Sequence, residues 1–225
     1  MSGRNVVIAI VALALAAPAF AGDIVAMPTG NTVAPRNVEL NAILWERPPS
    51  QGPGDYITIG EVFVGVTDWL ELDVVYADVK DVDSYMEVNL YGTVLKEKPN
   101  FPSLIVGVTN VLGQDWLPGA AKFAGTGDDP SFFAVSSYNL LVPPGPPSWT
   151  EPLIRLHLGW GTGWHDEEFF GGAQFLVDPK LGGAILSYKS MPAYVATWKP
   201  LDWLEVTYGA LDGRPVYRPG GFLSW

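Results

Sequence analysis

Apolar and polar residues alternate in short runs along most of this chain. In one clear run, Leu70, Leu72 and Val74 share one face, while Glu71 and Asp73 lie on the other. The same pattern recurs in residues 86–91, 154–161 and 204–208. Alternation with a period of two is typical of a β-strand with one face in apolar surroundings. The pattern therefore predicts an all-β protein.

We predict about twelve strands, or ten if two short C-terminal runs are not both strands. Their expected ranges are 37–46, 55–66, 69–78, 84–96, 103–112, 131–142, 153–163, 168–177, 181–189, 193–199, 202–210 and 216–225. Gly, Pro, Asp and Asn collect between these runs, as they do in turns. Residues 37–225 are expected to form one domain, preceded by an irregular lead-in over residues 22–36.

Alternation alone fits two architectures. In a soluble sandwich the apolar rows face a core, whereas in a membrane barrel they face lipid and the charges line the lumen. The connections favour the barrel, because tight turns such as Thr67-Asp68 fall on one side and the long segment Gly113 to Pro130 falls on the other. Outer-membrane barrels have short periplasmic turns and longer outer loops. The sequence therefore predicts an antiparallel transmembrane β-barrel.

The first 21 residues have the features of a secretory signal peptide. Arg4 is followed by an apolar run, Val6 to Ala17, and then by the small-x-small motif Ala19-Phe20-Ala21. The apolar run is shorter than the roughly 20 residues that a membrane-spanning helix needs. We expect export with cleavage before Gly22, and a location in the bacterial outer membrane.

Composition excludes several classes of function. The net charge of −11 argues against a nucleic-acid partner, which requires clustered Lys and Arg. The chain has no Cys, which excludes thiolate metal sites and Cys nucleophiles. Nine Trp, nine Tyr and ten Phe suit the aromatic girdles of a membrane barrel, but also a carbohydrate-binding surface. We expect Trp69, Trp203 and Trp225 to be interfacial anchors.

In a barrel, the polar rows would line the lumen. The candidates are Glu61, Glu71, Asp73, Glu87, Asn89, Arg155, His157 and Glu205. Such charges usually form ion pairs, since an unpaired charge removed from water is costly. The excess of carboxylates predicts an acidic lumen that favours cations over anions.

Three short segments resemble a known family. They are Met27-Pro28-Thr29-Gly30, followed by Pro35, then Val38-Glu39-Leu40, and Asp68-Trp69-Leu70-Glu71-Leu72. They are similar to the opening of the YjbH-like outer-membrane β-barrels, which are associated with exopolysaccharide production. The resemblance covers about the first third of the mature chain, and this chain is shorter than full-length members of that family. It implies an outer-membrane location and a link to polysaccharide export, and it transfers no catalytic residue.

The function expected from the sequence is that of a structural or porin-like channel barrel, not an enzyme, with no cofactor and no metal site. Its expected partners are membrane lipid and lipopolysaccharide, the barrel-insertion machinery, and polysaccharide or small cations. One alternative is a secreted or periplasmic all-β carbohydrate-binding module. The other is a barrel hydrolase that uses His157, or His165 in the acidic segment 164–168, as its base.

Overall fold

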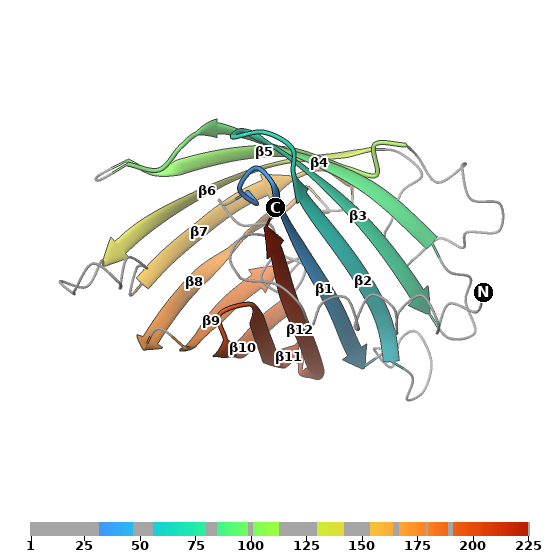
Figure 1. Cartoon of the computed structure of the whole chain (residues 1–225), viewed down its shortest axis with the longest axis vertical. Coiled ribbons are helices and arrows are strands. Elements are labelled where there is room, and N and C mark those ends of the chain that lie inside the picture. Colours follow the sequence, from blue (N-terminus) through green and yellow to red (C-terminus); the bar gives the residue numbers. More distant parts are fainter. Residues whose placement is uncertain are drawn as a thin grey trace.

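A computed structural model describes residues 32–46, 56–79, 85–98, 101–112, 130–141, 154–163, 167–178, 180–188 and 191–224. Within these ranges, twelve antiparallel strands form one closed barrel (Figure 1). The prediction of an all-β barrel with about twelve strands is confirmed. The expected signal peptide and residues 22–31 of the lead-in lie outside the described residues. No helix in the described ranges is long and apolar enough to cross a membrane.

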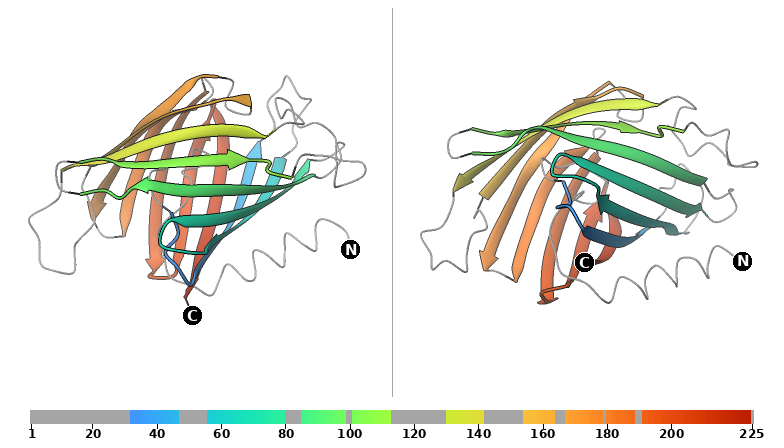
Figure 2. Two further views of the ribbon diagram at one scale, coloured as in Figure 1. Left: turned by 90° about the horizontal axis from the view of Figure 1, so that it is seen from above. Right: turned by 45° about the horizontal axis from the view of Figure 1, so that its top comes forward.

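Each strand pairs with its neighbours in the chain, and β1 pairs with β12 to close the wall. Figure 2 shows the strands tilted and wrapped around a single interior. The strands are β1 (Asn37–Glu46), β2 (Tyr56–Gly65), β3 (Leu70–Val79), β4 (Tyr85–Leu95), β5 (Ser103–Thr109), β6 (Ser131–Leu141), β7 (Ile154–Gly161), β8 (Phe169–Asp178), β9 (Leu181–Tyr188), β10 (Met191–Leu201), β11 (Leu204–Leu211) and β12 (Arg214–Ser224).

Strand direction distinguishes the two ends of the barrel. β1 begins and β12 ends at the same end, which we call the terminal end. The turns between β2 and β3 and between β10 and β11 lie there too, because adjacent strands are antiparallel. We call the opposite end the loop end; β1 ends there and β12 begins there.

The tightest described turn at the loop end joins β11 to β12. Asp212 and Gly213 both have positive φ, 51° and 71°, and Leu211 pairs with Arg214 across the turn. An Asp-Gly pair in this conformation makes a two-residue hairpin whose twist matches that of the strands. The sequence predicts a longer connection here, over residues 211–215. The two strands instead continue until only Asp212 and Gly213 separate them.

β10 is longer than the predicted 193–199, because it includes a proline near each end. Proline has no N–H to donate to a neighbouring strand, which is why sequence rules place it outside strands. Pro192 nevertheless takes part in pairing through its carbonyl, which accepts the N–H of Asp212 at 2.8 Å. A strand end can use a proline in this way because only the acceptor is needed.

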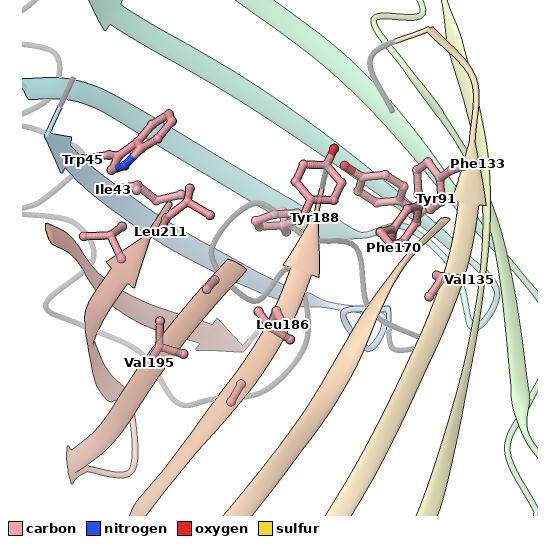
Figure 3. Close-up of a cluster of buried hydrophobic side chains, with 14 of the residues drawn as sticks. Ile43, Trp45, Tyr91, Phe133, Val135, Phe170, Leu186, Tyr188, Val195 and Leu211 are labelled. Carbon is pink, nitrogen blue, oxygen red and sulfur yellow. The ribbon is translucent and has the colours of Figure 1, made fainter. Parts of the chain in front are cut away.

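Most of the apolar side chains in the interior lie toward the loop end. Ile43 and Trp45 come from the second half of β1, Phe170 from the start of β8, and Tyr188 and Leu211 from the ends of their strands (Figure 3). Among the described residues, every strand except β7 contributes to this cluster. The rings of Phe170 and Tyr188 meet edge to face at 5.6 Å. Buried apolar side chains therefore project into the interior at this level.

Candidate functional site in the barrel interior

Most of the buried charged side chains in the interior lie toward the terminal end. Of the residues expected to line the lumen, the following are buried: Glu61, Glu71, Asp73, Asn89, Arg155 and His157. Glu87 and Glu205 are half-buried. All eight occupy inward positions of the alternation, on strands β2, β3, β4, β7 and β11. The structure brings five of them into clusters with other side chains: Asp73, Asn89, Arg155, His157 and Glu205.

The largest cluster spans the seam where the barrel closes. Arg218 on β12 forms ion pairs with Glu39 on β1 at 3.0 Å and with Glu205 on β11 at 3.7 Å. Lys199 on β10 lies 3.8 Å from Glu205, and Asn41 donates to Glu39 at 2.8 Å. Mutual pairing offsets part of the cost of removing these charges from water. This cluster links the first strand to the last three.

A second cluster surrounds Asp73 on β3. Its Oδ2 accepts hydrogen bonds from the side-chain amide of Asn89 at 2.8 Å and from the hydroxyl of Tyr91 at 3.2 Å. Asn89 in turn accepts the backbone N–H of Asn110 at 2.9 Å. The carboxylate is therefore held by neutral donors, and the chain of bonds ties β3 to β4 and to the end of β5.

A third cluster begins at Arg155 on β7. Its guanidinium lies 2.9 Å from the carboxylate of Glu97, which follows β4 at the terminal end. The other oxygen of Glu97 accepts the backbone N–H of Asn139 on β6 at 2.7 Å. Glu97 thus connects a turn to two strands that are remote from it in the sequence.

His157 lies between a serine and a glutamine. Ser137 Oγ on β6 is 2.6 Å from His157 Nδ1, and Gln174 Oε1 on β8 is 3.4 Å from Nε2. With Gln174 accepting the Nε2 proton, Nδ1 is free to accept the serine proton, which is the arrangement of a nucleophile with its base. Ser137, however, is only 1% exposed. The pair therefore has the geometry of a nucleophile and its base, but both side chains are buried within the wall.

The two described anchor residues lie at the terminal end. Trp69 is exposed and precedes β3, and Trp203 is half-buried and precedes β11. The sequence places each at the first positions of a strand, whereas both lie in the preceding turn. Thr67 explains the first case, because its hydroxyl accepts the N–H groups of Trp69 and Leu70 at 3.3 and 3.0 Å. Trp225 and His165 lie outside the described residues.

The outer wall has the opposite chemistry to this polar interior. Its outward positions carry exposed apolar side chains on strand after strand: Val106, Phe132, Leu156, Leu158, Phe169, Phe175, Val177, Ile185, Tyr194, Trp198, Tyr208 and Tyr217. Leu158 is 62% exposed. Arg155 and Gly161 on the same strand are buried, because they lie on the opposite, inward face. Buried charges and an exposed apolar wall reverse the arrangement of a water-soluble protein.

Sequence reasoning missed Glu39, Lys199 and Arg218 as interior residues. Glu39 and Asn41 do alternate with Val38 and Leu40, but the following Ala-Ile-Leu-Trp run is apolar on both faces. That run hides the phase of the alternation. Arg218 lies between Tyr217 and Pro219 and shows no alternating row at all.

No family model matches the chain, and no curated protein matches it. In the described part of the chain, no group of three or more His, Asp or Glu is placed to hold a metal ion. The class defined by the fold is a closed twelve-stranded antiparallel β-barrel. Its function is inferred from the barrel's own residues.

Proposed function

We propose that this protein is a bacterial outer-membrane β-barrel of structural or channel type. The observation that carries the proposal is the reversed wall, with ion pairs such as Arg218–Glu39 inside and side chains such as Leu158 and Trp198 outside. Soluble proteins rarely expose a contiguous apolar surface of this extent. In lipid the same surface is favourable, and a closed barrel leaves no unpaired strand edge.

Strand length agrees with this proposal. The twelve strands have 7 to 11 residues, close to the roughly 9–11 residues that a tilted strand needs to cross a bilayer. Trp69 and Trp203 at the terminal end are suited to a membrane–water interface. The expected signal peptide supplies the route out of the cytoplasm.

The location is tested by fractionating cells that express the full chain. We expect the mature protein in the outer-membrane fraction, extractable only with detergent. On a gel, the folded barrel should resist SDS until boiled and migrate differently before and after boiling. Release in soluble form without detergent would contradict the proposal and favour the carbohydrate-binding alternative.

We favour a structural role, or a channel that is closed in this conformation, because many apolar and charged side chains are buried inside the barrel. Most of the apolar cluster lies toward the loop end, and the buried ion pairs lie toward the terminal end. Planar-bilayer recording should therefore show no steady open pore. Where openings occur, cations should pass more readily than anions, because buried Glu61, Glu71 and Asp73 line the polar half. A stable, anion-selective pore would contradict this assignment.

The link to exopolysaccharide rests on the resemblance of the opening segments to YjbH-like barrels. Deleting the gene in the bacterium that carries it should reduce the exopolysaccharide that is secreted. Restoring the gene should recover it. Unchanged secretion in the deletion strain would remove this part of the proposal and leave the barrel assignment intact.

A further inference from the structure

A short segment ahead of β1, residues 32–36, turns into the barrel at the terminal end. We call it the strap; it forms the blue hook beside the start of β1 in Figure 1. Val33 in the strap is 2% exposed and belongs to the interior apolar cluster. Its backbone N–H donates to the carboxylate of Glu71 on β3. The hydroxyl of Thr32 lies 3.1 Å from that of Thr93 on β4. The strap therefore reaches past β2 into the interior.

The wall of β2 is shaped to receive the strap. Arg36 has a positive φ of 63°, which reverses the chain, and the N–H of Asn37 bonds to the carbonyl of Ala34 at 3.1 Å. The N–H of Arg36 also donates to the carbonyl of Gly65 at 3.3 Å. A Cβ atom at Gly65 would overlap the carbonyl oxygen of Ala34. Glycine is thus required for this close approach of two backbones.

We propose that the strap is a built-in closure of the interior at the terminal end, with Glu71 as its latch. Glu71 is a buried carboxylate, which is stable only with hydrogen-bond donors around it. The Val33 amide supplies a charge-assisted bond, stronger than one between neutral groups. Opening the interior at this end requires the strap to leave, exposing Val33 and the Glu71 carboxylate together. The closure goes beyond the proposed function and is testable in detergent, whatever the cellular location.

The docked position is tested by cross-linking, because the chain has no cysteine of its own. The double variant Thr32→Cys with Thr93→Cys should form a disulfide in the folded barrel under mild oxidation, since the two hydroxyls are in contact. Thr197→Cys with Thr207→Cys is the positive control, with hydroxyls 3.0 Å apart inside the wall. Thr32→Cys with Thr162→Cys is the negative control, because Thr162 follows β7 at the loop end. Failure of the first pair while the positive control cross-links would overturn the docked strap.

The latch is tested by labelling a buried thiol at Val33→Cys with a maleimide. Adding Glu71→Ala should raise the labelling rate about ten- to a hundredfold, the usual effect of losing a hydrogen bond to a charged group. Gly65→Val should also raise it, by displacing Ala34 while keeping the Glu71 carboxylate, although Gly65 and Glu71 are paired across β2 and β3. Asp73→Asn is the matched control, because Asp73 shares the face of Glu71 but bonds to Asn89 and Tyr91.

The gel shift on boiling reports whether each variant is still a folded barrel. If Glu71→Ala does not fold, the Gly65→Val variant decides whether the strap is a separable closure. Labelling that stays at the parent rate in every folded variant would show that neither contact holds the strap, and the proposal would be wrong.

Discussion

Arg218 on the last strand and Glu39 on the first form a buried ion pair, 3.0 Å apart, across the seam that closes the barrel. The two strands also pair through their backbones over most of their length. The ion pair adds a side-chain connection between residues 179 positions apart in the sequence. The first and last strands have to pair in one register, and a single buried pair can favour one register over its neighbours.

Removing one partner of this pair should destabilise the barrel strongly. Arg218→Met leaves Glu39 and Glu205 without their shared cation, and breaking a buried pair in this way costs about 3–5 kcal/mol. The measurement is urea unfolding of the barrel refolded in lipid vesicles. Arg214→Met is the matched control on the same strand, because its ion pair with Glu46 is partly exposed. The control should lose less than about 1 kcal/mol. Equal losses in the two variants would show that the seam pair has no special role.

Glycine at position 159 should be required by the ring of Phe170. A Cβ atom at position 159 would overlap this ring. β7 contributes no side chain to the apolar cluster, and the ring of Phe170 packs over it instead. Gly159→Ala should therefore destabilise the barrel by about 1–3 kcal/mol through overpacking. Gly92→Ala is the control, since the nearest atom to a Cβ there is 3.8 Å away. Its unfolding free energy should stay close to that of the parent, and a larger loss at position 92 than at 159 would contradict the packing argument.

The serine beside His157 should be inert toward reagents that label serine hydrolases. Ser137 is buried, and its hydroxyl is bonded to His157 Nδ1 at 2.6 Å. A fluorophosphonate should not label the folded barrel. Ser137→Ala should instead cost about 1–3 kcal/mol of stability, because it leaves a buried imidazole nitrogen without that partner. Labelling that disappears in the Ser137→Ala variant would reverse this prediction and favour the hydrolase alternative.

Much of the fold could be predicted from the sequence, because the strands of a barrel repeat one simple pattern. The first strand is predicted at its observed bounds, 37–46, and most others to within one or two residues. The differences arise where a single residue acts against its usual preference. Pro192 joins β10 through its carbonyl, and Asp212-Gly213 shortens a connection to two residues.

The interior was less predictable, because its contacts depend on which strands become neighbours. Alternation indicates that Asp73 faces away from Leu72, but not that Asn89 and Tyr91 would hold it. The strap could not be inferred, since nothing in residues 32–36 marks them as an inserted segment. Gly65 was the available signal: a glycine at the end of a strand often marks close approach by another backbone.

The outer wall offers a prediction that separates the membrane barrel from a soluble one. Leu158 is 62% exposed near the middle of the wall, so in water an arginine there should change stability by no more than about 0.5 kcal/mol. In a bilayer, Leu158→Arg should instead cost about 2–4 kcal/mol, the penalty for a cation near the midplane of a membrane barrel.

The matched control is Leu112→Arg, because Leu112 is 55% exposed but lies past the end of β5 at the loop end. A cation at the interface costs only about 0–1 kcal/mol. Unfolding both variants from lipid vesicles should therefore give a large loss at position 158 and a small one at 112. Equal, negligible losses would indicate that the apolar wall does not lie in lipid. Neither substitution should affect the ion pairs inside the barrel.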